Sequence, residues 1–250
     1  MIRIIATLTV LAAIAGVFGV IVGAHVEVNH LRPLSASYVT LVPEALNTPN
    51  VITGILITYR GFDTLGEVAV LFMVAASLAL LFEPPSGAAS RKEPVRAAGE
   101  IVESGRQGLF PMIMAFGSYV ALNGHLSAGG GFQGGAIIAS GFMLLVIANP
   151  SISVNTAVLS VTESTAGLLF IILGILGIVL AGGFLDPRFL PAGNAGDFIS
   201  AGAIPVISAL LGLKVSAELS VIIDQFRSCG RWWRCRPFRS RRSCWPRAGG

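Results

Sequence analysis

Charged residues are scarce in this 250-residue chain, at 12% of the sequence, whereas a soluble domain carries about 25%. Hydrophobic residues make up 54% of the chain, and the mean hydropathy is +0.78. The apolar residues come in several runs of roughly 17–25, each long enough to cross a hydrocarbon layer of about 30 Å. The sequence therefore predicts an all-α, polytopic transmembrane protein and leaves no large water-soluble domain.

Cysteine is also scarce, and Cys229, Cys235 and Cys244 all lie in the C-terminal tail. The membrane body therefore offers no disulfide framework and no thiolate metal site, and we expect no metal, no cofactor and no enzymatic activity. Eight of the 17 basic residues fall in the last 24 positions, so the pI of 9.3 mainly describes the tail. Nucleic acid is not an expected partner.

The apolar runs predict about six spans. The first could be a cleavable signal peptide, but its length and the helical spacing of its glycines favour a retained span. His25–Asn50 is expected to be a loop or a short surface helix, Asn149–Thr162 a polar connection, and Pro205 an interior residue of the last span. The predicted spans are Ile4–Ala24, Leu65–Phe82, Leu109–Leu126, Ala136–Ala148, Ser164–Phe184 and Phe198–Phe226.

Composition divides the chain into a two-span module (1–83), a linker (84–108), a four-span module (109–226) and a basic tail (227–250). The tail abruptly becomes rich in Arg, Trp, Cys, Ser and Pro, as a frameshifted GC-rich reading frame would be. The alternatives for it are a polybasic anchor to anionic lipid or a cysteine metal site, although the cysteine spacing fits no compact zinc motif.

Basic residues also predict the orientation, because cytoplasmic loops are rich in Lys and Arg. Arg3, four basic residues of the linker and eight of the tail would lie inside, against Arg32, Arg60 and Arg188 outside. We therefore expect a multi-pass protein of the cell (inner) membrane with both termini in the cytoplasm.

Three ionisable residues precede or enter the second apolar run, in the stretch Arg60-Gly-Phe-Asp63-Thr-Leu-Gly-Glu67. On a continuous helix their spacing places them on one face. Arg60 and Asp63 are either an interfacial pair at the helix end or part of a polar path. Glu67 lies within the apolar run, where an ionised carboxylate is costly. We expect Glu67 to be buried, to pass protons or bind a cation, and to have Lys214 as its counterpart in the chain.

Lys214 and Glu218 are four residues apart in the last apolar run, so they lie one above the other on a helix. They either neutralise each other while docking to a neighbour or form an intramembrane relay. Glu163, just before the fifth predicted span, is either a helix N-terminal carboxylate or a transport group. His125 ends the third predicted span, as a solvated cap or as a proton relay.

A glycine run between the third and fourth predicted spans formally satisfies G-x-G-x-x-G. No strand precedes it, so it is not a nucleotide-binding loop. We expect these glycines to form a tight turn and to let helices approach closely. The glycines expected to serve helix packing are Gly129, Gly130, Gly131, Gly134 and Gly135.

Two parts of the chain resemble known families. Asn50–Glu67, with its Arg-Gly-Phe-Asp-Thr-Leu-Gly-Glu core, resembles the C-terminal region of the large A-type component of Mrp-type sodium/proton antiporters, which is a separate E-type component in membrane-bound hydrogenases. Leu109–Val221 resembles the B-type component of the antiporters, the MnhB family. The matching segments are Gly-Gly-Gly-Phe-Gln-Gly-Gly-Ala-Ile-Ile-Ala139, Glu163-Ser-Thr, and Ile204-Pro followed by Gly212-Leu-Lys-Val215.

The resemblance implies a non-catalytic membrane subunit of a multi-subunit cation/proton complex, related to the ion-translocating arm of respiratory complex I. It implies ion-path roles for Asp63, Glu67 and Lys214, whereas Glu218 belongs to no family pattern. Expected partners are the A- and D-like antiporter subunits, the small C-, E-, F- and G-like subunits, lipid, Na+ and H+.

Three other functions compete with the antiporter assignment. Fusion of an E-type to a B-type module favours an assembly with hydrogenase or other oxidoreductase subunits as one alternative. A purely structural spacer is the second. An independent small transporter is the third and weakest, since the two halves show no inverted repeat.

Overall fold

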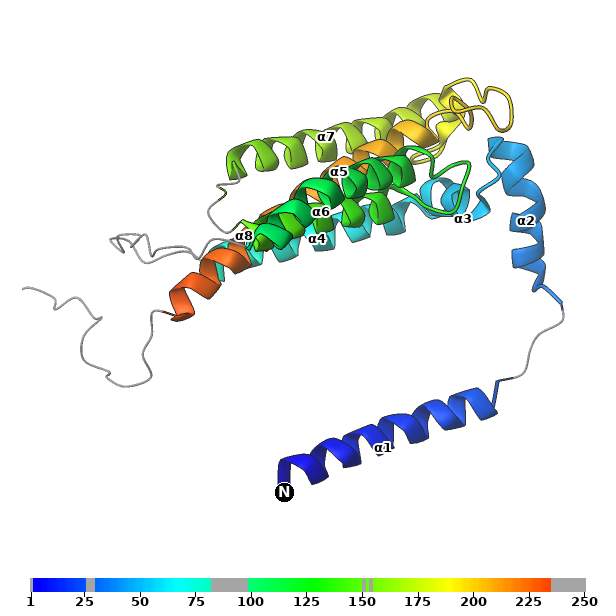
Figure 1. Cartoon of the computed structure of the whole chain (residues 1–250). Coiled ribbons are helices and arrows are strands. Elements are labelled where there is room, and N and C mark those ends of the chain that lie inside the picture. Colours follow the sequence, from blue (N-terminus) through cyan, green and yellow to red (C-terminus); the bar gives the residue numbers. More distant parts are fainter. Residues whose placement is uncertain (1, 26–29, 82–98, 150–151, 153–154, 235–250) are drawn as a thin grey trace, which may run out of the picture. The chain divides into compact units, whose positions relative to one another are not determined.

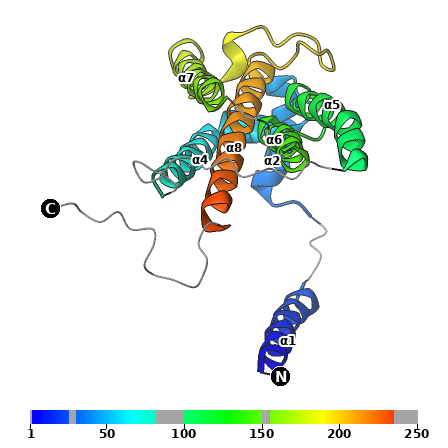
Figure 2. The same ribbon diagram turned by 60° about the vertical axis from the view of Figure 1, so that its left-hand side comes forward.

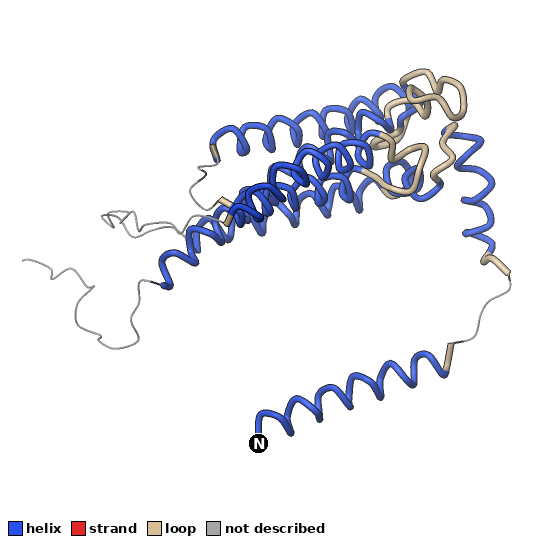
Figure 3. Tube along the Cα trace, viewed as in Figure 1, coloured by secondary structure: helices blue, strands red, loops and turns tan. Residues whose placement is uncertain are grey.

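The computed structural model describes residues 2–25, 30–81, 99–149, 152 and 155–234, and this part of the chain is helical with connecting loops and contains no strand (Figure 3). The chain forms two compact units, residues 1–38 and 39–250. The first unit contains α1 (Ile2–Gly23), whose segment Ile4–Gly23 is long and apolar enough to cross a membrane. The predicted all-α, polytopic fold is confirmed.

The second unit contains a bundle of long helices that run side by side (Figure 1). α2 (Pro33–Leu46) begins in the first unit and ends in the second, where Val42 and Leu46 are buried. The remaining elements are α3 (Val51–Gly54), the π-helical turn η1 (Ile55–Tyr59), α4 (Gly61–Leu81), α5 (Glu100–Leu122), α6 (Gly131–Ala148), α7 (Thr156–Ala181), the 3-10 turn η2 (Pro187–Phe189) and α8 (Ile204–Arg234).

α8 is the central helix of the bundle, in contact with α4, α5, α6 and α7 (Figure 2). Small residues on α8 let its neighbours approach closely. Ser208 is fully buried there, and its hydroxyl donates a hydrogen bond to the carbonyl oxygen of Ala121 in α5 at 2.8 Å. Larger apolar residues such as Ile207, Leu211 and Val215 fill the remaining space around this helix.

Five of the described helices are long and apolar enough to span a membrane, one fewer than the expected six. The remaining long helix is α5, which contains most of the predicted third span. It begins at Glu100 and carries Glu103 and Arg106 ahead of that span, so only the part of the helix from Leu109 onward is apolar. It ends at Leu122 instead of Leu126.

Other predicted boundaries also differ from the structure. α7 begins at Thr156, where the side chain of Asn155 accepts hydrogen bonds from two backbone amides, so the second half of the predicted polar connection is helix. α8 begins at Ile204, and residues 198–203 form a loop with positive φ at Ala201. Pro205 therefore lies in the first turn of α8, where proline disrupts no helical hydrogen bond. α6 begins at Gly131, so part of the predicted glycine turn is helical.

Two predicted segments lie partly outside the described residues. Residues 84–98 of the linker are not described, whereas its end forms the start of α5. α8 remains helical to Arg234, past the predicted start of the tail, and residues 235–250, with Cys235 and Cys244, are not described. The division into modules stays a prediction.

Hydrogen bonds join the two regions that resemble different families. The hydroxyl of Thr48 donates to the carbonyl oxygen of His125 at 2.6 Å. The amide of Asn50 donates to the carbonyl oxygens of Gly124 and Ser127, each at 2.7 Å, and the hydroxyl of Thr53 donates to that of Gly124 at 2.8 Å. The segment before α4 is thus hydrogen-bonded to the loop between α5 and α6.

Candidate functional site

Three ionisable side chains from α7 and α8 come together inside the bundle. Lys214 Nζ donates a hydrogen bond to Glu218 Oε2 at 2.8 Å, one turn further along α8. The same nitrogen lies 3.9 Å from Oε1 of Glu163 on α7. The predicted pair of Lys214 and Glu218 is therefore present, and Glu163 joins it as a third member of what we call the charge cluster.

The charge cluster is buried well inside two apolar helices. The exposed fraction is 8% for Glu163, 5% for Lys214 and 0% for Glu218. Glu163 lies seven residues beyond the start of α7 and Lys214 ten beyond the start of α8, which is about 10 Å and about 15 Å along the helix axes. Glu163 is therefore not a helix N-terminal carboxylate, because the helix begins two turns before it.

Two neutral residues also lie beside the lysine. The ring of Phe72 on α4 lies 5.9 Å from Lys214 Nζ, close enough for a cation–π contact. Gly167 on α7 lies beside the aliphatic stem: a Cβ atom added there would be 3.4 Å from Lys214 Cε and 3.7 Å from its Cδ. No sequence pattern pointed to Phe72. Gly167 follows Glu163 by four residues and so shares its helix face, which could have indicated it.

The charged residues of α4 have the opposite environment. Arg60 Nε donates to Asp63 Oδ2 at 2.5 Å, and both side chains are at least half exposed, at 59% and 50%. The helix is interrupted at Arg60, which ends the π-helical turn η1 with φ −119° and ψ 32°. The three predicted residues are therefore not on one continuous helix, although Asp63 and Glu67 share a face of α4.

Glu67 is exposed, six residues inside α4, and has no ionic partner within the described residues. The expectation that it is buried within this chain is wrong, because α4 turns Gly61, Thr64 and Val68 toward the bundle. Lys214 is not its counterpart, since the lysine pairs with the carboxylates of α7 and α8.

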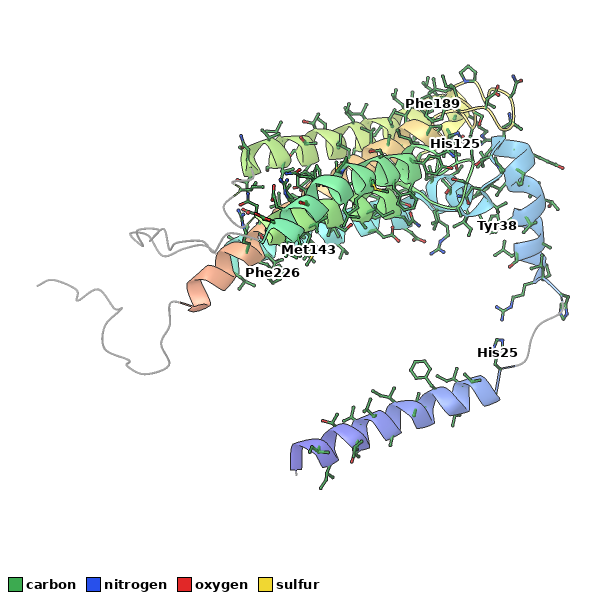
Figure 4. All side chains as sticks on the ribbon, in the orientation of Figure 1. His25, Tyr38, His125, Met143, Phe189 and Phe226 are labelled. Atoms are coloured by element: carbon green, nitrogen blue, oxygen red, sulfur yellow. The ribbon has the colours of Figure 1, made fainter. Side chains whose placement is uncertain are left out.

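His125 lies at the end of the bundle that also holds Phe189, opposite the end with Met143 and Phe226 (Figure 4). It is fully buried, and neither ring nitrogen has a hydrogen-bond partner among the described residues. Its ring meets Phe198 edge to face at 6.4 Å between centroids. Burial lowers the pKa of the imidazole. His125 is therefore not a solvated cap.

The glycine run lies where α6 meets its neighbours. A Cβ atom on Gly131 would overlap the carbonyl oxygen of Ser208, and one on Gly135 would lie 2.8 Å from that of Gly212, both on α8. On Gly134 it would lie 2.6 Å from Cβ of Ala121 on α5. Side chains at these positions would force the helices apart. The other two glycines, Gly129 and Gly130, precede the helix. A Cβ atom added there would lie 3.0 Å from its nearest neighbour at Gly129 and 2.9 Å at Gly130.

Within the described residues, no group of three or more His, Cys, Asp or Glu side chains is arranged to hold a metal ion. The charge cluster has two carboxylates, and an ammonium group lies between them. Its arrangement suits the binding and transfer of protons better than the coordination of a metal.

Two family models match the chain. A domain related to the MnhB subunit of Na+/H+ antiporters matches residues 101–221, and the MbhE model, which describes the E-type component of MBH, matches residues 4–94. A chain of the membrane-bound sulfane sulfur reductase, an archaeal respiratory membrane complex, is 31% identical, with a TM-score of 0.74 over 90% of this chain and 98% of that one. The chain belongs to this MbhE- and MnhB-type family of membrane subunits.

Other relatives agree with this family. An uncharacterized protein of Methanocaldococcus jannaschii is 31% identical over 199 residues, which is 69% of this chain and 74% of the relative. A protein of Rhizobium meliloti, named as the probable A/B component of a K+/H+ antiporter, is 36% identical over 117 residues, 38% of this chain but 12% of the relative. The Mrp complex of a Dietzia species has the same fold, with a TM-score of 0.68 at 22% identity over 89% of this chain and 26% of that one.

Proposed function

We propose that this chain is a transport subunit of a multi-subunit, Mrp-type cation/proton antiporter module, in which it forms part of the ion path and holds neighbouring subunits. The family named for a component of Na+/H+ antiporters and the relative named for K+/H+ antiport support this assignment. The match covers 12% of the length of that relative, so this chain corresponds to one part of a larger protein.

The charge cluster is the observation that carries the transport role. A helical spacer gains no stability from a lysine and two carboxylates at membrane depth, because apolar residues of similar volume would pack there as well or better. Ionisable residues inside spans usually mark proton or ion pathways. Glu163, Lys214 and Glu218 are therefore the core of the path in this chain.

Glu67 and Asp63 belong to the part of the path that a neighbouring subunit completes. Both lie on the outward face of α4, and Glu67 has no ionic partner within the described residues. A carboxylate exposed to lipid at this depth is costly. A helix of another subunit with a basic or hydrogen-bonding side chain at the level of Glu67 would remove that cost. Arg60, paired with Asp63, lies just before the first residue of α4.

The second candidate is a component of the membrane arm of a respiratory or hydrogenase-type complex. The 31% identity to a chain of the sulfane sulfur reductase complex, over 98% of that chain, favours it. The role of this chain in moving ions would be the same in both assemblies. Purification of the native complex decides between them: redox subunits would be present in one case and antiporter subunits alone in the other.

Transport activity tests the proposal directly. The whole operon is expressed in cells that lack their own antiporters, and the collapse of a pH gradient on addition of NaCl or KCl is measured in inverted vesicles. We expect Lys214→Met to abolish this response in a complex of unchanged subunit composition. Glu103→Gln, which removes a carboxylate from the ion pair with Arg106 on α5, is the control and should retain activity. Full activity of Lys214→Met would reduce the chain to a spacer.

The orientation is part of the proposal. The alternating helices place the C-terminal ends of α4, α6 and α8 at the same end of the bundle, with the N-terminal ends of α5 and α7 (Figure 1). The basic linker and tail join this end, and the concentration of Lys and Arg supports a cytoplasmic location for it. Labelling of a cysteine introduced at Arg106 from outside intact cells would contradict this orientation.

A further inference from the structure

The charge cluster has an unbalanced charge. Two carboxylates and one ammonium group carry a net charge of −1 when all three are ionised. Glu218 is fully buried, and its Oε1 has no hydrogen-bond partner within the part of the chain that the structure describes. A net charge at such a place is costly unless another positive charge joins it.

The elements packed around α8 do not supply that charge. α6 has no ionisable residue, and α7 has Glu163 alone. α4 faces the cluster with the ring of Phe72, whereas its charged residues are exposed. Most of the other charged groups that the structure describes on or next to these helices form their own pairs: Asp63 with Arg60, Glu103 with Arg106, and Asp224 with Arg227. Glu100 lies in the first turn of α5, and Glu67 on α4 is exposed.

A proton fits the cluster better than a metal cation. Hard cations require several oxygen ligands at once. The cluster offers two carboxylates, and one oxygen of Glu218 already accepts a hydrogen bond from Lys214. The ammonium group of Lys214 lies 2.8 Å from one carboxylate and 3.9 Å from the other, so it occupies the place that a cation would take.

We propose that Glu163, Lys214 and Glu218 form a single-proton site, in which two carboxylates share one proton and Lys214 pairs with whichever carboxylate is ionised. This proposal rests on the proposed transport function and names the species that the cluster binds. In the observed arrangement Lys214 is hydrogen-bonded to Glu218, so the proton is on Glu163.

Transfer within the site conserves charge. The O–H bond of the Glu163 carboxyl breaks, an O–H bond forms on Glu218, and the ammonium of Lys214 moves from Glu218 to the newly ionised Glu163. The cluster is neutral before and after this step, so neither state leaves a buried net charge.

The surroundings favour Glu163 as the entry point. Its side chain is 10% exposed, whereas that of Glu218 is 0% exposed, so a proton from solvent or from a neighbouring subunit reaches Glu163 first. Gly167 lies one turn further along α7, and its missing side chain leaves space beside the lysine stem. The stem can therefore tilt toward Glu163 without meeting a side chain at that position.

Infrared spectroscopy of the whole complex in lipid nanodiscs counts protonated carboxyl groups without any transport assay. At neutral pH we expect one carboxylic acid band from this site in the wild type. Glu163→Gln and Glu218→Gln should each remove it, because either change leaves a neutral pair of lysine and carboxylate. Lys214→Met should add a second acid band, since two buried carboxylates then lack a counter-charge.

The two glutamine variants test the sharing of the proton. If the band survives in Glu218→Gln, Glu163 is protonated without sharing its proton with Glu218, and the proposal fails. Loss of the wild-type band on addition of NaCl or KCl at constant pH would show that a metal cation replaces the proton, which also overturns it. Glu163→Gln removes the more exposed carboxylate, so it is the variant of choice if Glu218→Gln does not assemble.

Failure of the proton site and failure of the transport role are distinguishable. A wild type without the acid band, in a complex whose antiport still depends on Lys214, refutes the proton site alone. Normal antiport by Lys214→Met, with the expected band changes, refutes the transport role alone. Subunit composition is checked by gel filtration for each variant, with Glu103→Gln as the control.

Discussion

Two regions of the chain place ionisable residues in apolar helices, and they do so in opposite ways. At the start of α4, Arg60, Asp63 and Glu67 are exposed at the surface of the chain. On α7 and α8, Lys214 and its two carboxylates are almost completely buried. The charged side chains of the first region can contact lipid, water or another subunit, whereas those of the second are paired with one another inside the chain.

The difference follows from the position of each helix in the bundle. α8 is in contact with four other helices, and Ser208, Lys214 and Glu218 on it are buried among them. α4 touches the bundle through α8 and presents its opposite face outward. A charge in an apolar sequence run therefore indicates a functional group, but the helix arrangement decides whether its partner lies in the same chain.

The largest expected effect comes from removing the central cation. Lys214→Ala leaves two buried carboxylates without a counter-charge, and breaking a buried ion pair in this way costs about 3–5 kcal/mol. We expect a large fall in the thermal unfolding midpoint of the purified complex. The double variant Lys214→Met, Glu218→Gln should recover part of the loss, because Glu163 is then the one member of the charge cluster that lacks a counter-charge.

Arg60→Ala provides the comparison on α4. Its ion pair with Asp63 is exposed, and exposed pairs contribute little to stability. We expect an unchanged midpoint. Equal destabilisation by Arg60→Ala and Lys214→Ala would mean that the two regions do not differ as the structure indicates.

The next effect compares a glycine of α6 that packs against α8 with a glycine on α4. Gly131→Ala places a methyl group against the backbone of α8, well inside van der Waals contact, and forcing extra volume into a packed contact costs about 1–3 kcal/mol. Gly66→Ala on α4 meets nothing within 4 Å and improves helix propensity by up to about 1 kcal/mol. Opposite shifts of the unfolding midpoint are therefore expected. A neutral effect of Gly131→Ala would contradict the close contact between α6 and α8.

The sequence predicted the helical membrane fold and the pair of Lys214 and Glu218, because apolar length and i, i+4 spacing are local properties. It could not predict that Glu163 joins this pair, since the contact depends on how α7 packs against α8. It misjudged Glu67 for the same reason. Hydropathy indicates which segments can span a membrane, but it does not show which side of a helix faces other protein.

Of the two alternatives for His125, the solvated cap is wrong, because the burial of the residue depends on distant residues. The loop that contains it is covered by Phe198 and held by Thr48 and Asn50, which lie more than 70 residues away along the chain. No local pattern around a histidine at a helix end distinguishes this environment from a solvated one.

A smaller effect is expected at the outward face of α4. Glu67→Gln should leave the folding of the chain unchanged, because the residue is exposed in it. It should weaken the contact with the neighbouring subunit that compensates the carboxylate. Disulfide crosslinking from Val70→Cys, one turn further along the same face, measures this contact. We expect a lower crosslinking yield in the Glu67→Gln background than with Glu67 intact.

Gly66→Ala sharpens that measurement. Gly66 is adjacent to Glu67 and has open space around it in the chain, so its methyl group disturbs the assembly only if a partner helix packs closely there. Unchanged crosslinking in both variants would indicate that lipid, and not a protein neighbour, covers this face.

The smallest effect is a pH dependence of the junction, by which we mean the hydrogen-bonded contact between the segment before α4 and the loop that contains His125. The folded pKa of His125 is lowered by burial, so below the ordinary imidazole pKa of about 6.5 the unfolded state binds the proton more readily than the folded one. The stability of the junction is therefore complete above this pH and is lost as the pH falls through the folded pKa. Hydrogen exchange at the amide of Asn50, which donates to the carbonyl oxygen of His125 at 3.2 Å, reports the opening.

His125→Gln should remove this extra acid-induced opening, because glutamine does not titrate, while its amide can still fill much of the site. His30→Gln is the control, since His30 is exposed and lies outside the junction. If the protection of the Asn50 amide falls with pH in the same way in His125→Gln as in the wild type, another group controls the junction. Loss of the slope in His125→Gln alone would make this histidine the acid-sensitive contact between α5 and the segment before α4.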